Sequence, residues 1–290
     1  MTTISTSSQN FGLDHQQTAG AVVRKHVDTD SKTELPSRLP ASTSSAIDRV
    51  SSLSLDVTTD PSLKVTGEPG IAIDKVLASK QFQDWTASMD HKKFNVRSVH
   101  IQSVDMFGPK VGFIKFKADV VDDEGKFIPG ICFMRGGSVG ILPVLKCEGK
   151  SFAILTLQPR ITTGQFDFAE IPAGMLDGSG NFMGVAAKEL EEEVGLKVSE
   201  KDLTDLSALA KHPRGFFASP GGSDETIRLY SLTQEVAKEK LAELNGRCTG
   251  VLDEGEQITL KVVPLDDLLS IPDGKTLVAY LLYKKFVEKT

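Results

Sequence analysis

Three glutamates stand out because their spacing could bring them together on one helix: Glu189, Glu192 and Glu193. Residues 185–196 have the apolar spacing of a helix, and Gly195 is placed to end it with a left-handed cap. Positions i, i+3 and i+4 share a face, so three like charges would repel one another there. A divalent cation would balance them, and carboxylate oxygens suit Mg²⁺ or Mn²⁺. The alternative is a solvated acidic face, which an isolated run of this kind favours.

The surrounding sequence favours the metal site over the solvated face. From Gly174 to Leu196 it reads GMLDGSGNFMGVAAKELEEEVGL. This resembles the Nudix box, the signature of hydrolases that act on a nucleoside diphosphate linked to another group. The family pattern is Gly, five residues, Glu, seven residues, then Arg-Glu-apolar-x-Glu-Glu-x-Gly-apolar. Two positions depart from it, because Gly180 replaces the first Glu and Lys188 replaces the Arg. Lys188 keeps the charge but not the planar fork of arginine.

Shorter segments narrow the resemblance to the ADP-ribose and ADP-sugar pyrophosphatase branch. They are residues 158–160 (QPR), 170–174 (EIPAG), 219–225 (SPGGSDE) and 253–256 (DEGE). The stretch from Val104 to Asp119 is similar to plant and fungal ADP-sugar diphosphatases. We therefore expect a small nucleotide sugar as the substrate.

The resemblance implies a metal site and a general base. The ligands that it implies are the backbone carbonyl of Ala173 and the carboxylates of Glu189, Glu193 and Glu256. Glu192 would share a metal or fix one of its ligands, and Lys188 would take the place of the arginine that orients a glutamate. Glu254 would deprotonate the attacking water. Glu225 is the alternative base, since carboxylates of mobile loops exchange this role between members of the family.

The same resemblance implies four residues that bind the substrate. Arg160 would meet the diphosphate or the terminal sugar through charge-assisted hydrogen bonds, and Glu170 would bind hydroxyl groups of the nucleoside or sugar. Gly221 and Gly222 would let backbone amides approach the ligand. Each also has a structural interpretation: a surface arginine, a glutamate at a strand end, and a simple turn.

The remaining sequence predicts the elements that position these residues. Predicted strands cover residues 97–105, 111–121, 126–135, 138–145, 152–158, 226–232 and 257–263. Predicted helices cover residues 76–88, 182–194, 235–244 and 276–289. Strands without strict alternation with helices indicate the α+β class. The Nudix resemblance specifies an α/β/α sandwich with a mixed sheet, preceded by an N-terminal antiparallel sheet. Residues 138–145 and 152–158 are almost wholly apolar, so we expect them at its centre.

Composition divides the chain into three parts. Residues 1–68 are predicted to be a disordered tail, because they are rich in Ser and Thr and hold one aromatic residue, Phe11. Residues 69–136 would form the N-terminal helix and antiparallel strands, the expected dimerisation region, and residues 137–290 the Nudix domain. The tail has no apolar core of a secretion signal, so we expect a cytoplasmic protein, with organelle targeting by the tail as the alternative.

Charge and cysteine content exclude several classes of protein. There are 33 Lys and Arg against 39 Asp and Glu, a net charge of −6, which argues against a protein that binds nucleic acid through bulk charge. No run approaches the roughly 18 consecutive apolar residues of a membrane span. Cys132, Cys147 and Cys248 lie far apart, which indicates buried thiols in a reducing compartment.

The combined prediction is a Mg²⁺-dependent hydrolase that cleaves ADP-glucose or ADP-ribose to AMP and a sugar phosphate. One alternative is a catalytically idle Nudix module that binds a nucleotide sugar or a protein partner, and Gly180 and Lys188 support it. The other is an enzyme for a dinucleotide or a nucleoside triphosphate, which the EIPAG and SPGG segments disfavour. The family also implies a homodimer in which the N-terminal strands of one chain complete the site of the other.

Overall fold

The computed structural model describes residues 63–176, 181–250 and 257–288. Most of the predicted tail lies outside this range, but its last residues do not. Lys64–Gly67 forms strand β1, which pairs in parallel with β2 (Asn95–Phe107). The N-terminal sheet is therefore mixed, and the prediction of a purely antiparallel sheet was wrong in this respect. A four-residue strand is too short to show a clear alternation of apolar and polar residues.

The N-terminal sheet runs in the order β1-β2-β3-β4, and β5 also pairs with β3. The strand predicted at residues 111–121 is β3 (Lys110–Val121), and the one predicted at 126–135 is divided into β4 (Phe127–Ile128) and β5 (Ile131–Met134). Pro129, which has no N–H to donate, lies at the division. The helix predicted at residues 76–88 is likewise divided into two, α1 (Ile73–Ala78) and α2 (Lys80–Ala87), because the backbone of Ser79 between them is extended. Both helices contribute to the core of this sheet.

The second sheet has nine strands and contains both parallel and antiparallel pairs. Its main path is β10-β12-β6-β7-β14-β13, with β11, β8 and β9 paired to β12, β7 and β6. The long strands are β6 (Ser138–Cys147), β7 (Lys150–Arg160), β12 (Thr226–Glu235) and β14 (Ile258–Pro264). The short ones are β8 (Gln165–Glu170), β9 (Ala173–Met175), β10 (Leu203–Asp205), β11 (Phe216–Phe217) and β13 (Cys248–Thr249). The predicted central strands are β6 and β7, and β6 is buried almost throughout.

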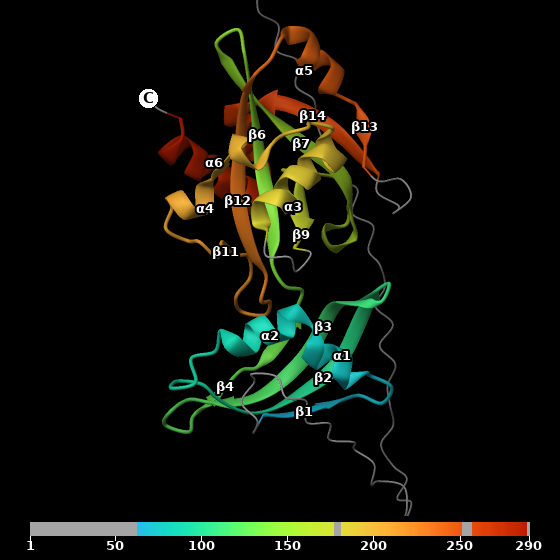
Figure 1. The fold of residues 1–290 in the computed structure, drawn as a ribbon, viewed down its shortest axis with the longest axis vertical. Helices are drawn as coiled ribbons and strands as arrows, with labels where there is room; N and C mark the ends of the chain where they lie inside the picture. Colours follow the sequence, from blue (N-terminus) through green and yellow to red (C-terminus); the bar gives the residue numbers. More distant parts are fainter. Residues whose placement is uncertain (1–62, 177–180, 251–256, 289–290) are drawn as a thin grey trace, which may run out of the picture. The chain divides into compact units, whose positions relative to one another are not determined.

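Helices cover both faces of this sheet (Figure 1). One face packs against α3 (Phe182–Glu189), the π-helical turn Leu190–Val194 and α5 (Lys238–Leu244). The other packs against α4 (Leu206–Leu209), the 3₁₀ segment Leu265–Ser270 and α6 (Gly274–Phe286). Neighbouring residues of β6 face opposite cores, as Ile141 and Leu142 do. The predicted α/β/α sandwich with a mixed sheet is confirmed.

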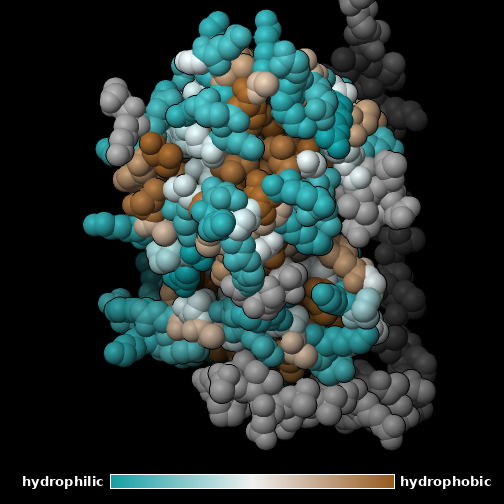
Figure 2. All heavy atoms as spheres, turned by 45° about the horizontal axis from the view of Figure 1, so that its top comes forward, coloured by the Kyte–Doolittle hydropathy of each residue, from teal (hydrophilic) through white to brown (hydrophobic). Residues whose placement is uncertain are grey.

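The surface carries mainly hydrophilic side chains on the face that Figure 2 presents, with smaller hydrophobic areas among them. Within the described ranges, no helix is long and apolar enough to cross a membrane. Of the three cysteines, Cys147 is buried and Cys132 half-buried, whereas Cys248 is exposed, so the prediction of buried thiols fails for Cys248.

Candidate active site

The predicted site helix starts at Phe182, where the side chain of Asn181 accepts a hydrogen bond of 3.0 Å from Gly184 N. Its buried side chains pack into the core beneath it, Val185 and Ala186 among them. After Glu189 the helix changes to a π-helical turn, Leu190–Val194, which Gly195 ends at φ 73°. Single π turns of this kind occur often at functional sites, because the wider turn changes the direction of the side chains.

Two of the three helix glutamates converge on strand β9. Glu193 is only 4% exposed, and its Oε2 accepts a hydrogen bond of 3.0 Å from Ala173 N. A Cβ added to Gly174 would lie 1.7 Å from Glu189 Oε1, so Glu189 occupies the space that a side chain at position 174 would need. The glycine is therefore required for this close approach. The structure thus brings together three of the four predicted metal ligands: Ala173, Glu189 and Glu193.

The third helix glutamate, Glu192, lies beside Lys188. Its Oε1 lies 3.3 Å from Lys188 Nζ, and the two side chains are 34% and 70% exposed. That all three glutamates share one face stays a prediction, and the π turn brings Glu193 round towards Glu189. Lys188 does contact a glutamate of the helix, as the replaced arginine would.

The carboxylates fit a divalent cation in kind, because Glu189 and Glu193 supply hard oxygen atoms beside the backbone of β9. Within the described ranges, no three His, Cys, Asp or Glu side chains form a complete metal cluster. The further predicted ligand, Glu256, and the predicted base, Glu254, lie outside the described residues. So does Gly180, the position of the missing family glutamate.

The ends of the segment that carries Glu254 and Glu256 lie beside the π turn. Thr249, the last residue of β13, donates a hydrogen bond of 2.5 Å to the backbone oxygen of Glu193. Thr249 also pairs with Ile258, the first residue of β14. The described residues on either side of residues 251–256 therefore lie close to Glu193.

Arg160 and Glu170 contact each other directly. Arg160 ends β7, Glu170 ends the neighbouring strand β8, and Arg160 Nε donates a hydrogen bond of 2.6 Å to Glu170 Oε1. The side chain of Glu170 is 4% exposed, and its other oxygen accepts from Lys275 Nζ. Both carboxylate oxygens are engaged by cations, which favours a structural role for Glu170 over contact with substrate hydroxyl groups.

The predicted glycine loop is attached to strand β5. The backbone oxygen of Gly222 accepts a hydrogen bond of 2.8 Å from Phe133 N, while Gly221 and Gly222 are exposed. Glu225, the alternative base, is half-buried and lies 3.5 Å from Arg135 Nε. The loop thus carries a carboxylate that is already paired with an arginine.

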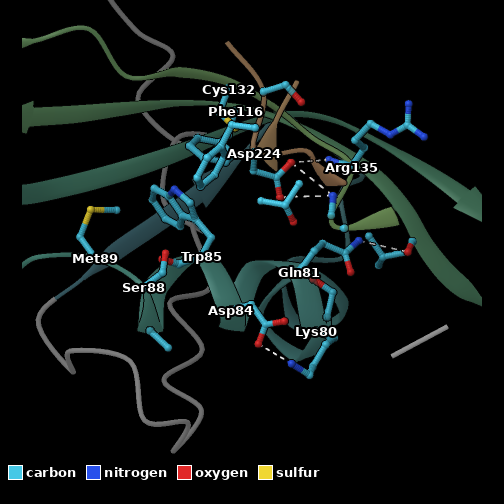
Figure 3. A pocket seen from close by; sticks show the side chains of 18 of the residues that line it. Lys80, Gln81, Asp84, Trp85, Ser88, Met89, Phe116, Cys132, Arg135 and Asp224 are labelled. Carbon is cyan, nitrogen blue, oxygen red and sulfur yellow. Dashed lines mark hydrogen bonds and ion pairs between the residues drawn. The ribbon is translucent and has the colours of Figure 1, made fainter. Parts of the chain in front are cut away.

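Asp224, for which the sequence predicted no role, anchors this loop. Its carboxylate accepts hydrogen bonds from the backbone N–H groups of Arg135 and Gly136, which Figure 3 shows as dashed lines. Burial raises the pKa of this carboxyl above its ordinary value of 3.8, against the opposing effect of those hydrogen bonds. Burial and the nearby Asp224 together raise the pKa of the Cys132 thiol to about 11.

The same residues border a cavity of about 1410 Å³. Trp85 and Phe116 form part of its wall, with ring centroids 4.8 Å apart, and Asp224 lines it from the loop (Figure 3). None of Glu189, Glu192 and Glu193 lines this cavity. This cavity and the glutamate cluster are therefore separate features, and the chemistry predicted from the sequence concerns the cluster.

Three residues of the site region escaped the sequence analysis: Asp273, Lys275 and Thr276. Asp273 caps α6 by accepting a hydrogen bond from Thr276 N. An aspartate is a common N-cap residue, so its position could have predicted where the helix begins. Lys275 carries no signal, because its partner Glu170 is 105 positions away in the chain.

Comparison with known proteins identifies relatives for most of this region. Residues 134–284 match the family model described as the NUDIX domain. Over 220 residues the chain is 38% identical to Nudix hydrolase 14, chloroplastic, of Arabidopsis thaliana, covering 72% of this chain and 71% of the relative. It is 29% identical over 157 residues to ADP-ribose pyrophosphatase of Bacillus subtilis (strain 168), covering 54% and 74%. A solved structure described as an ADP compounds hydrolase covers 67% of this chain and 94% of its own, with a TM-score of 0.46 and 16% identity.

Proposed function

Since the chain belongs to the Nudix family and is a pyrophosphatase acting on nucleoside diphosphate compounds, we propose that it cleaves ADP-ribose or ADP-glucose to AMP and a sugar phosphate, with Mg²⁺ or Mn²⁺ as its cofactor. The observation that carries the proposal is the convergence of Glu189 and Glu193 on β9. The printed name of the Bacillus relative, an ADP-ribose pyrophosphatase, supports the choice of substrate.

The metal would be held by Glu189, Glu193, Glu256 and the carbonyl of Ala173. When bound, such a cation neutralises diphosphate oxygens and lowers the pKa of a bound water. Burial of Glu193 and its hydrogen bond from Ala173 N fix one carboxylate in place, which reduces the reorganisation needed on binding. The Glu192–Lys188 pair would steady the exposed side of the same turn.

The substrate side would be supplied by Arg160 and by the loop of Gly221 and Gly222. Nε of Arg160 is held by Glu170, so the orientation of the guanidinium is fixed before an anion arrives. Glu254 would act as the general base, and Glu225 is the alternative. The contact between Glu225 and Arg135 favours Glu254, because that contact already engages the carboxylate of Glu225.

A substrate panel tests this function. Purified protein with Mg²⁺ or Mn²⁺ is given ADP-ribose, ADP-glucose, a dinucleotide and a nucleoside triphosphate, and the products are identified. We expect AMP and a sugar phosphate from the first two. No product from any nucleotide sugar would overturn the proposal in favour of the idle binding module.

Glu193→Gln tests the metal site within the same assay. Glutamine still offers an oxygen to Ala173 N, so we expect the fold to survive, while activity falls by about 1000-fold or more because a charged ligand is lost. Glu191→Gln is the matched control, since Glu191 lies on the same turn, is exposed, and pairs with Lys197 at 3.2 Å. Equal activity in the two variants would remove Glu193 from the site.

Two further parts of the proposal concern assembly and location. A homodimer through the N-terminal sheet is supported by its exposed apolar side chains, among them Phe107, Phe127 and Ile131. Light scattering of the purified protein should give twice the mass of one chain. The cytoplasmic location stays a prediction, and the chloroplastic relative supports the alternative of a targeting tail. A fluorescent fusion at the C-terminus distinguishes the two locations.

A further inference from the structure

A group of four charged side chains links the ends of β7 and β8 to the start of α6. Glu170 accepts from Arg160 Nε on one oxygen and from Lys275 Nζ on the other. Lys275 also lies 3.1 Å from Asp273 Oδ1. The side chains of Glu170, Lys275 and Asp273 are 4%, 11% and 11% exposed. Two acids and two bases balance in charge, as buried ions must.

The same group also fixes the backbone that leads to the site. Asp273 Oδ2 accepts from Thr276 N at 3.0 Å and from Thr276 Oγ1 at 2.5 Å. Thr276 Oγ1 in turn accepts from Ile171 N at 3.0 Å, and Thr276 is fully buried. Ile171 follows Glu170 directly, and two residues later Ala173 N donates to Glu193. The start of α6 is therefore attached both to the side chain and to the backbone of the segment 170–173.

The orientation of Arg160 depends on Lys275. Arg160 is 40% exposed and could adopt many rotamers, whereas Glu170 is almost fully buried. Glu170 can hold Arg160 in one orientation only if its own carboxylate is fixed, and Lys275 is the group that fixes the second oxygen. Without Lys275, the carboxylate would be free to rotate towards Arg160, and the guanidinium would lose its defined direction.

We propose that Lys275 is a positioning residue that orients Arg160 towards the substrate through Glu170. This inference rests on the proposed function, because it assigns Arg160 to the binding of the diphosphate or the terminal sugar. Lys275 itself does not touch the substrate. Its effect should therefore appear in substrate binding and should vanish when Arg160 is absent.

The experiment is a double-mutant cycle with Lys275→Met and Arg160→Ala, measured by ADP-ribose hydrolysis at saturating Mg²⁺. We expect Lys275→Met to raise KM by about tenfold with kcat changed less than about threefold, because an interaction common to ground and transition states is weakened. In the Arg160→Ala background the same change should alter KM by less than about twofold. Lys275→Arg, which keeps the charge, should recover most of the loss.

Lys284→Met is the matched control, since Lys284 is an ion-paired lysine on the same helix whose partner Asp266 lies 3.3 Å away. It should leave KM unchanged. If Lys275→Met does not fold, Lys275→Gln retains a donor for Glu170 and should raise KM at least about threefold, with the same dependence on Arg160. A readout without turnover is the Kd for ADP-ribose in the Glu193→Gln background, which should rise with KM.

The outcomes separate the two claims. A wild-type protein that neither hydrolyses nor binds any nucleotide sugar overturns the proposed function, and this inference with it. An active wild type in which Lys275→Met has the same effect on KM with and without Arg160 overturns the positioning role alone. A lowered melting temperature with unchanged KM also overturns it, because that is the result of a purely structural ion pair.

Discussion

The contact between Gly174 and Glu189 offers the sharpest test of the site geometry, through the substitution Gly174→Ala. The new Cβ would lie 1.7 Å from Glu189 Oε1 and 2.0 Å from its Cδ, whereas ordinary contact begins at 3.4 Å. The carboxylate would have to withdraw by about 1.7 Å. The atoms that must move are at the end of a flexible side chain, so the backbone of β9 can stay in place.

The expected loss is in activity and not in stability. A misplacement of about 1 Å at a catalytic group can cost about 100-fold, so we expect kcat/KM for ADP-ribose to fall by about 100-fold, or about 2.7 kcal/mol. The free energy of unfolding should change by less than about 1 kcal/mol. The assay is the initial rate against substrate and Mg²⁺ concentration, together with denaturant unfolding of the same sample.

Gly274→Ala is the control for this substitution, because no atom lies within 4 Å of a Cβ added there. It should keep full activity. The reasoning is refuted if Gly174→Ala retains activity within about threefold of wild type, since a carboxylate displaced by more than 1 Å cannot serve a metal site of fixed geometry. It is also refuted if Gly174→Ala unfolds the protein, because the clash would then lie in the backbone.

Two further predictions concern the loop that Asp224 anchors. Because burial raises the pKa of Asp224, the folded state binds its proton more tightly than the unfolded state, so its contribution to stability is fully present below about pH 3.8 and is lost as the pH rises through the folded pKa. The melting temperature of wild type relative to Asp224→Asn should therefore fall as the pH rises through this window, and a parallel pair of curves would contradict the assignment. The pKa of about 11 for Cys132 predicts slow reaction with a disulfide reagent at about pH 8, whereas exposed Cys248 should react at once. Cys248→Ser should remove the fast phase, and its persistence would show that Cys132 is reactive.

The sequence predicted the long elements and failed on the short ones. The apolar runs of β6 and β7 were sufficient to place them at the centre of a sheet covered on both faces. Strand β9 has three residues, and nothing in its composition distinguishes it from a loop. It nevertheless carries Ala173 and Gly174, against which the buried Glu193 and the half-buried Glu189 lie. Its place depends on pairing with β6, a contact between segments more than thirty positions apart.

The structure adds a detail of the site's geometry that the spacing of the glutamates did not predict. Spacing along an ideal α-helix placed Glu189, Glu192 and Glu193 on one face, but the turn from Leu190 to Val194 is π-helical. Periodicity cannot reveal a local change of helix type, since the hydrophobic pattern on its buried side is unaffected. The sequence also could not predict that Lys275 pairs with Glu170. A single lysine near the start of a helix is common and does not indicate a particular partner.

The structure also shows where the acidic residues of the chain lie, which bears on how an acidic protein can bind an anionic substrate. A net charge of −6 is by itself unfavourable for a substrate that is also anionic. Several acids of the site region are matched by bases, since Glu170 meets Arg160 and Lys275, and Glu192 meets Lys188. Glu189 and Glu193 lie against the backbone of β9. A cation bound there would reverse the local sign and attract a diphosphate. The distribution of the acids, rather than their number, decides which anions the protein can accept.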